Sequence, residues 1–373
     1  MISNLESYCE KWNLKVNMSK SEILIFRKGG RLGRNEKWKF NGNEIKNVNE
    51  YKYLGVTFTP KLSFSKHIEK RTSQSKMAIN STWIDFLGKK DVNMKMKWKV
   101  YEAVCRSVQT YAAQVWGYSY FDEVDKLQRY FLKKILKVPS FTPNYALMLE
   151  TNVENCHLYT LKLNLKYIHQ VLYRYQEHRL PTILTNILLE KEGFWVANIK
   201  SMAHRLNVQW PNTANEDEWT LFSKCIIGKE KTYLLQENLR LKQQSQDRIY
   251  KHLDYRMGEM YFTDSFTSDQ ISWIFKARCG LINLNATRFN TENAERKCTL
   301  CNLIRDETLQ HFIGECPILA EFRTSFFQSA ILSEEDVINI LDGREAHYWR
   351  QLVIYLKICL NYREFLIFEY NSV

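Results

Sequence analysis

The chain has 373 residues, a length that allows two or three domains with separate hydrophobic cores. Its content of 45% hydrophobic and 14% aromatic residues excludes wholesale disorder, and no apolar run approaches the ~20 residues that a membrane span requires. The nine cysteines are odd in number and mostly scattered, which fits a reducing compartment better than a disulfide scaffold. We therefore expect a soluble intracellular protein, nuclear or cytoplasmic, without membrane contact.

The positive charge is unevenly distributed along the chain. Residues 1–150 contain 27 Lys and Arg against 14 Asp and Glu, whereas residues 151–373 contain 26 against 27, so the whole surplus of +12 lies in the first part. A concentrated positive field favours a polyanion, because each neutralised phosphate releases counterions. The alternative is a basic surface that is only solvated. The charge pattern thus suggests nucleic acid as a partner and leaves the alternative open.

The first 60 residues predict a small α+β unit. A helix is expected over residues 3–15, where Ser3 and Glu6 have the spacing of a capping box. Strands are expected over residues 21–26 and 51–58, which are short and rich in apolar, aromatic or β-branched side chains. Asn41-Gly42 between them is a strong tight-turn signal.

Beyond residue 60 the pattern becomes helical. Apolar residues recur at spacings of three and four over residues 67–87, 94–116, 123–136, 157–175, 270–278 and 349–368. In the third of these segments, Leu127, Tyr130, Phe131 and Ile135 fall on one side. Helices joined by short loops predict a bundle, whereas residues 193–245 give no clear pattern.

A group of four possible metal ligands lies near the C-terminus. Cys298, Cys301, His311 and Cys316 have the spacing Cys-x2-Cys-x9-His-x4-Cys, and three thiolates with one imidazole complete the tetrahedral shell of a structural zinc. His311 is expected to project from a short helix over residues 307–313, and Pro317 suits the first turn of the next helix. The alternative is buried small hydrophobes with a core histidine. We favour a structural zinc as the cofactor.

Several segments resemble a known family. The chain contains Lys20-Ser21-Glu22-Ile23-Leu24-Ile25-Phe26 and, later, Tyr51-Lys52-Tyr53-Leu54-Gly55-Val56. This series resembles the region just after the catalytic Asp-Asp turn of jockey-like non-LTR retrotransposon reverse transcriptases. The Cys and His spacing, with Asp306-Glu307-Thr308 and Cys316-Pro317, is similar to the zinc knuckle beyond the thumb of that family.

The resemblance implies an overall architecture. The fold would be mainly α with a small α+β N-terminal unit. Its parts would be a palm remnant with a primer-grip-like strand (1–60), a helical thumb-like bundle (61–180), a helical connector (181–285), and a zinc knuckle with C-terminal helices (286–373).

The resemblance also implies nucleic-acid contacts in the first 60 residues. Tyr53, Leu54 and Gly55 would form the primer-grip turn, where glycine allows close approach of the backbone to a sugar-phosphate. A basic cluster on and after the strand at residues 21–26 would contact phosphates; it comprises Lys20, Arg27, Lys28, Arg31 and Arg34. An ordinary core strand and a solvated loop are the alternatives.

Polymerase chemistry requires paired carboxylates that hold two metal ions, and the chain contains no Asp-Asp dipeptide. The acidic clusters at residues 216–218 and 334–336 read as solvated helix caps. In the resembled family the catalytic carboxylates would lie upstream of Met1. We therefore expect a truncated RNA-directed DNA polymerase that is no enzyme on its own.

Such a protein would bind RNA, an RNA–DNA hybrid or a DNA duplex through its basic thumb and zinc knuckle. An upstream polymerase or endonuclease portion on the parent polypeptide would be a further partner. Two alternatives stay open: a zinc-stabilised scaffold for protein interactions with no nucleic-acid role, and an enzyme whose catalytic half is supplied by another chain.

Overall fold

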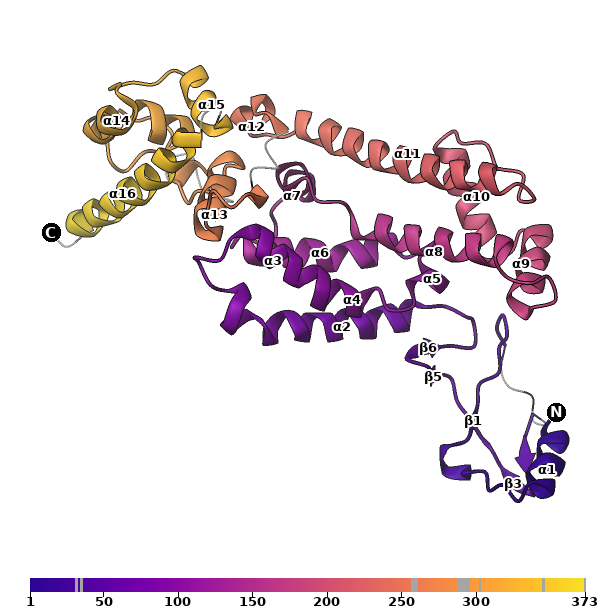
Figure 1. The fold of residues 1–373 in the computed structure, drawn as a ribbon. Coiled ribbons are helices and arrows are strands. Elements are labelled where there is room, and N and C mark those ends of the chain that lie inside the picture. Colours follow the sequence, from indigo (N-terminus) through magenta and orange to yellow (C-terminus); the bar gives the residue numbers. More distant parts are fainter. Residues whose placement is uncertain are drawn as a thin grey trace.

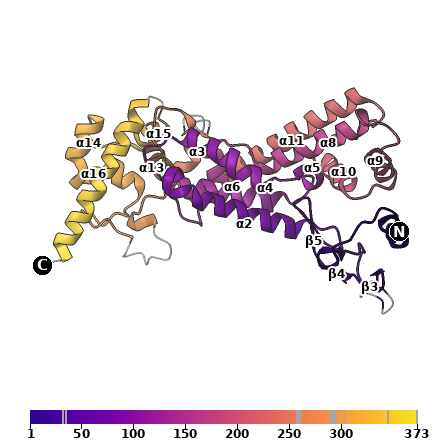
Figure 2. The same cartoon turned by 60° about the horizontal axis from the view of Figure 1, so that its bottom comes forward.

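The computed structural model describes residues 1–30, 33, 36–255, 261–287, 296–301, 303–343 and 346–371. Helices carry most of the chain, and the named strands of this described part all lie in the first 60 residues, so the predicted mainly α class with a small N-terminal α+β unit is confirmed. The molecule is elongated, with its two termini at opposite ends (Figures 1 and 2).

The N-terminal unit combines one helix with short paired strands. Helix α1 (Ile2–Lys11) is followed by a 3-10 turn, η1 (Met18–Lys20). The strands pair as β1 (Glu22–Ile23) with β4 (Lys46–Asn47) in parallel, and as β2 (Lys39–Phe40) with β3 (Asn43–Glu44) and β5 (Tyr51–Tyr53) with β6 (Val56–Phe58), both antiparallel.

The predicted capping box at the start of α1 is wrong. The helix begins at Ile2 with Met1 at the N-cap, so Ser3 already lies within the first turn and cannot cap it. The Glu6 carboxylate instead accepts the backbone N–H of Asn41 at 2.6 Å, which ties α1 to the β2–β3 hairpin. The predicted tight turn is confirmed, because Asn41 and Gly42 both have positive φ, at 45° and 79°.

The two predicted strands are shorter than expected. Only Glu22–Ile23 of the segment at residues 21–26 pairs, and the segment at residues 51–58 folds back on itself as the β5–β6 hairpin. Its turn is made by Leu54 and Gly55, whose φ angles are 44° and 81°. Composition alone cannot distinguish one strand from two short arms when the turn contains a leucine.

A central bundle follows, and its elements run from residue 65 to residue 173. They are α2 (Ser65–Ser81), η2 (Trp83–Leu87), α3 (Met94–Val100), η3 (Tyr101–Arg106), α4 (Ser107–Gln109), α5 (Ala113–Trp116), α6 (Phe121–Ile135), α7 (Asn144–Thr151) and α8 (Cys156–Tyr173). The core includes Tyr101 stacked on Phe131, with ring centroids 4.3 Å apart.

Two details of the bundle differ from the sequence prediction. The expected helix over residues 94–116 is interrupted near Ala112, whose φ of 59° is left-handed and turns the chain before α5. Tyr130, expected on the buried side of α6, keeps 37% of its surface exposed while Leu127, Phe131 and Ile135 are buried. Its ring lies at the boundary of the apolar face rather than within it.

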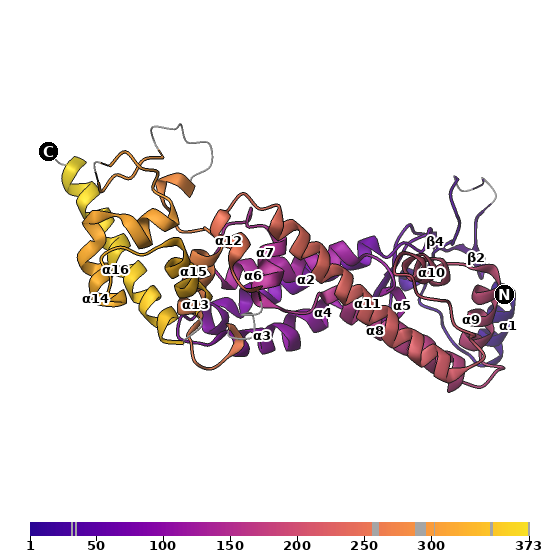
Figure 3. The same ribbon diagram turned by 90° about the horizontal axis from the view of Figure 1, so that it is seen from above.

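Three helices lie between residues 180 and 243, where the sequence predicted a helical connector but no bounds of individual helices. They are α9 (Leu180–Lys191), α10 (Trp195–Arg205) and α11 (Glu216–Gln243). The long helix α11 packs along α7 and α8 (Figure 3). Its Trp219 is fully buried among aromatic rings of the same region, including Trp195 and Trp210.

The C-terminal part is again helical. Its elements are α12 (Arg248–His252), α13 (Ser268–Arg278), η5 (Asn285–Thr287), η6 (His311–Glu315), η7 (Pro317–Leu319), α14 (Ala320–Phe327), α15 (Glu334–Asp342) and α16 (Ala346–Asn371). The helices expected over residues 270–278 and 349–368 correspond to α13 and α16. In the part of the chain that the structure describes, no helix combines the length and apolarity needed to cross a bilayer.

A buried ion-pair network joins the central bundle to the C-terminal part. The Arg278 guanidinium on α13 donates to both carboxylate oxygens of Glu150 on α7, at 2.6 and 3.2 Å, and to Asp342 on α15 at 3.1 Å. The Tyr261 hydroxyl also donates to Glu150. Although burial opposes the charge, the Glu150 carboxylate raises the pKa of Arg278 above its ordinary value.

Candidate metal centre and nucleic-acid interface

The four predicted metal ligands come from three local structures that the fold brings together. Cys298 adjoins a short antiparallel bridge, in which its backbone N–H donates to the Arg305 carbonyl at 2.8 Å. Cys301 lies in the loop three residues later, His311 begins the π-helical turn η6, and Cys316 directly precedes η7. Pro317 is the first residue of η7, as predicted.

The expected helix over residues 307–313 begins later than predicted. Helical conformation starts at Leu309, whereas the N–H of Glu307 donates to the Arg296 carbonyl in an extended segment. The reason is the fully buried Glu307 carboxylate, which receives two hydrogen bonds of 2.7 Å from Arg363 on α16 and one from the N–H of Asn285. His311 still projects from the helical turn that follows.

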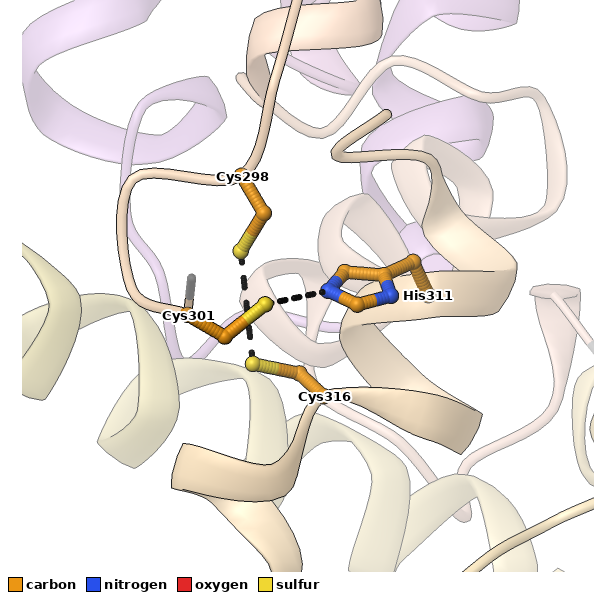
Figure 4. A group of neighbouring side chains, drawn as sticks. All are labelled: Cys298, Cys301, His311 and Cys316. Carbon is orange, nitrogen blue, oxygen red and sulfur yellow. Dashed lines mark hydrogen bonds between the residues drawn. The ribbon is translucent and has the colours of Figure 1, made fainter. Parts of the chain in front are cut away.

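The ligand atoms converge on one point (Figure 4). The Sγ atoms of Cys298 and Cys316 are 4.0 Å apart, Cys301 Sγ lies 3.4 Å from His311 Nε2, and all four atoms lie within 4.8 Å of one another. A tetrahedral zinc, with bonds of about 2.3 Å to sulfur and about 2.0 Å to nitrogen, keeps its ligand atoms about 3.5–3.8 Å apart. All four side chains are at least 92% buried. This Cys3His group could therefore hold a metal ion, and its donor set fits zinc.

Backbone N–H groups point at the cysteine sulfurs. The hydrogen bond with Cys316, together with burial, raises the pKa of the Cys298 thiol to about 12, while the N–H groups of Leu300 and Cys301 act to lower it. The same hydrogen bond with Cys298 lowers the pKa of Cys316, which also accepts the N–H of Ile318. Metal binding at this pair would require both thiols to lose their protons, because the thiolate is the ligand.

The His311 ring nitrogen that faces away from the cysteines, Nδ1, lies near a carboxylate. Among the described residues this Nδ1 has no hydrogen-bond partner, and it lies 3.7 Å from Glu315 Oε2, which is 3.1 Å from Arg305 Nη1. A carboxylate in this position orients a metal-ligating imidazole and favours the proton on the nitrogen away from the metal. The sequence prediction did not include Glu315, although its i, i+4 spacing from His311 is the signal that would have identified it.

A buried arginine fixes the backbone around Cys316. Arg323 on α14 donates to the carbonyls of Ile313, Cys316 and Ala330, at distances of 2.8 to 3.3 Å. This side chain is fully buried. Its contacts hold the turn at Cys316 in place, and no sequence signal distinguished it from the other arginines of the chain.

The predicted primer-grip residues form the tip of the β5–β6 hairpin. Tyr53 and Leu54 are 58% and 75% exposed. The carbonyls of Leu54 and Gly55 accept hydrogen bonds from the Tyr111 hydroxyl at 2.8 Å and from Arg71 Nη2 at 2.6 Å. A Cβ at Gly55 would lie 3.0 Å from both side chains, so glycine is needed for this close approach. Arg71 of α2 and Tyr111 thereby hold the hairpin in place, while Tyr53 and Leu54 at its tip are exposed.

The predicted basic cluster is only partly described. Lys20 ends η1 and Lys28 follows β1, both exposed, while the N–H of Arg27 donates to the Pro60 carbonyl. Arg27 shares the lining of a hollow of about 370 Å³ with Lys61 and Lys66, which the sequence did not group with it. Arg31 and Arg34 lie outside the residues that the structure describes.

A further group, of three lysines and two aromatic residues, lies between α2 and α6, and we call it the lysine strip. It consists of Lys76 and Trp83 from the α2–η2 side and Tyr130, Lys133 and Lys134 from α6. Lys76 Nζ lies 5.3 Å from the Tyr130 ring centroid, and Lys134 Nζ lies 4.3 Å from that of Trp83 and 2.7 Å from the side-chain amide oxygen of Asn80. Within the described residues, none of the three lysines has a carboxylate partner. Sequence reasoning missed the strip because its two halves are about fifty residues apart.

The acidic clusters lie in first turns of helices, as predicted. Residues 216–218 begin α11, where Asn215 caps the helix, and residues 334–336 begin α15, where Ser333 and Asp336 form a capping box. Among the described residues, the Cys3His group is the one cluster of His, Cys, Asp and Glu that could hold a metal ion.

No family model matches the chain, and no solved structure matches it. The chain is similar to the RNA-directed DNA polymerases from mobile element jockey of Drosophila melanogaster (27% identity over 139 residues) and Drosophila funebris (28% over 177 residues). It is also similar to the probable RNA-directed DNA polymerase from transposon BS of Drosophila melanogaster (22% over 155 residues). These alignments cover 36%, 46% and 41% of this chain but 15%, 18% and 17% of the relatives, so the chain spans less than a fifth of their length. The chain is therefore related to the RNA-directed DNA polymerases of non-LTR mobile elements.

Proposed function

We propose that this chain holds a nucleic-acid duplex for a reverse transcriptase and adds no nucleotides by itself. The polymerase or endonuclease portion of a parent polypeptide would supply the chemistry. The relatives are RNA-directed DNA polymerases, and the sequence contains no Asp-Asp dipeptide of the kind that binds two catalytic metal ions.

The lysine strip is the observation that carries this proposal. Lys76, Lys133 and Lys134 point their ammonium groups from two neighbouring helices without a carboxylate among the described residues to neutralise them. Rings under two of these ammonium groups restrict their positions and leave their N–H donors available. Phosphate oxygens of a duplex backbone match such donors, and contacts of this kind are independent of base sequence.

The N-terminal unit would extend the interface. Lys20, Arg27, Lys28 and Arg31 would add phosphate contacts. The exposed Tyr53 and Leu54 would press against the sugar-phosphate of a primer end, supported from behind by Arg71 and Tyr111.

The metal centre would have a structural role. A zinc ion bound by Cys298, Cys301, His311 and Cys316 has a filled shell and leaves no position for a catalytic water. It would cross-link the loop at residues 298–301 to the turns at residues 311–316, and so stabilise the C-terminal part against the core of α16.

A double variant tests the proposal. Lys76→Gln with Lys134→Gln should weaken binding of a labelled DNA duplex of unrelated sequence by about 3- to 10-fold and reduce the slope of log Kd against log salt by roughly 1.8, at ~0.9 per phosphate contact. The matched control is Lys224→Gln with Lys231→Gln, two exposed lysines on α11. Equal binding by the strip variant and the control would contradict the proposal.

An exposed apolar stripe favours the scaffold function as the second candidate. Leu180, Ile183, Leu184 and Ile187 lie on one face of α9 and are 39–66% exposed. A partner protein could cover this face. If the duplex does not bind at low salt, this interaction function becomes the better account.

A further inference from the structure

A second group of lysines lies where α6, α13 and α16 meet, and we call it the lysine cluster. It consists of Lys97 on α3, Lys137 directly after α6, Lys276 on α13 and Lys357 on α16. Asp269 in the first turn of α13 is their shared carboxylate: Oδ1 lies 3.3 Å from Lys137 Nζ, and Oδ2 lies 2.8 Å from Lys357 Nζ.

The lysine cluster has more positive charge than its aspartates neutralise. Lys137 repels both Lys97 and Lys276, and the opposing carboxylates are Asp269 and Asp91. Burial and the nearby Lys137 lower the pKa of Lys97 to about 8, and the same two causes lower the pKa of Lys276. Like charges held this close repel each other, so a bound anion would stabilise the arrangement.

The geometry leaves donors available at the surface of the cluster. The side chains of Lys137 and Lys357 are 36% and 42% exposed. Lys276 Nζ lies 5.5 Å from the centroid of the half-buried Trp273 ring. Lys97 is buried behind them, where it donates to the Lys89 carbonyl and to Ser268 Oγ, so it supplies charge rather than a direct contact.

The cluster continues the lysine strip. Lys137 follows Lys134 by three residues and lies two positions beyond the last residue of α6, where its φ of 53° turns the chain. On the other side, the chain runs from Trp83 of the strip to Lys89 and Lys90, whose carbonyls bond Lys97 and the N–H of Asp269.

We propose that Lys137, Lys276 and Lys357 bind backbone phosphates of the nucleic acid, so that the bound strand continues from the central bundle across α13 and α16. This inference rests on the proposed function. It assigns phosphate contacts to Lys276 and Lys357, which lie in the part of the sequence without surplus positive charge.

The direct test is the double variant Lys276→Gln with Lys357→Gln in the full chain, titrated with a labelled DNA duplex of about 20 base pairs between about 50 and 200 mM salt. We expect binding to weaken about 3- to 10-fold and the salt slope to fall by roughly 1.8, at ~0.9 per contact. Lys276→Arg with Lys357→Arg keeps the charge and should bind like the wild type, as should Lys224→Gln with Lys231→Gln.

The variant Asp269→Asn should strengthen binding instead of weakening it. It therefore tests the inference even if Lys276→Gln with Lys357→Gln does not fold. It removes the carboxylate that competes for Lys137 and Lys357, while the capping box of α13 is formed by Thr267 and Gln270 and stays intact. Tighter binding with a steeper salt slope is expected.

Two outcomes overturn the inference: unchanged binding by the glutamine double variant, or unchanged or weaker binding by Asp269→Asn. If Lys76→Gln with Lys134→Gln still weakens binding in that case, the proposed function stands and only the extension to α13 and α16 is wrong. If neither glutamine variant has an effect, both fail.

Discussion

Arg278 and Glu150 form a two-point ion pair inside the interface between α13 and α7, with both side chains no more than 1% exposed. Because neither charge can reach water, loss of one partner leaves the other buried and uncompensated. Arg278→Met should lower the free energy of unfolding by about 3–5 kcal/mol. Urea unfolding monitored by tryptophan fluorescence measures this. If the free energy of unfolding falls by no more than about 0.5 kcal/mol, as is usual for surface substitutions, the ion pair does not hold the central bundle and the C-terminal part together.

Zinc should bind at one equivalent per chain. Cys298→Ser or Cys316→Ser should abolish this binding and increase hydrogen exchange most within residues 296–322, because the metal links segments with few other strands or helices between them. Metal analysis and hydrogen-exchange mass spectrometry measure the two effects. Cys225→Ser, outside the Cys3His group, is the control and should keep its zinc. Wild-type protein that is saturated with zinc and retains well under one equivalent would refute the assignment.

His157 should make stability depend on pH. Burial alone would lower its pKa, but the hydrogen bond with Asp125 and the Glu230 carboxylate, 3.8 Å from Nε2, raise the pKa to about 9 from an ordinary value of 6.5. The protonated imidazole therefore stabilises the folded state fully below pH 6.5, and this contribution is lost as the pH rises through 9. The contribution amounts to at most about 3 kcal/mol, because a tenfold change in proton affinity corresponds to ~1.4 kcal/mol.

The measurement compares unfolding free energies at pH 6 and at a pH just above 9, for the wild type and for His157→Gln. The wild type should lose more stability than the variant over this interval. Equal losses would mean that the imidazole titrates alike in the folded and unfolded chains.

The purified chain should not extend a primer on an RNA template, because its sequence contains no Asp-Asp dipeptide to bind two catalytic metal ions. Incorporation of labelled nucleotide with Mg²⁺ or Mn²⁺ is the measurement. Template-dependent extension that co-purifies with the chain, and that is absent from a mock preparation, would overturn this expectation.

The grouping of Cys298, Cys301, His311 and Cys316 could be predicted from the sequence because a Cys-x2-Cys-x9-His-x4-Cys spacing is local and typical of metal coordination. Helices α6, α8, α13 and α16 were predicted because apolar residues recur in them at spacings of three and four. Helix α11 was missed because apolar residues occupy several of its faces: Phe222 and Ile226 are buried, while Leu221 and Leu235 are exposed. No single periodic stripe marks such a helix.

The lysine strip and the lysine cluster could not be predicted in this way. Lys76 meets Tyr130, and Lys137 meets Asp269 and Lys357, only through tertiary packing. Residues 151–373 have no surplus of positive charge, so the sequence provided no reason to expect phosphate contacts at Lys276 and Lys357. The capping-box prediction at Ser3 was wrong because α1 begins at Ile2, so that Met1 and not Ser3 is the N-cap residue.

The central claim is that this chain grips nucleic acid through its phosphates. The most direct measurement is the Kd of the wild-type chain for two duplexes of the same length and unrelated sequence, at several salt concentrations between about 50 and 200 mM. We predict equal Kd values for the two duplexes and a linear fall of log affinity with log salt, with a slope that corresponds to several phosphate contacts. Absence of binding at the lowest salt, or binding that depends on sequence and not on salt, would contradict the account.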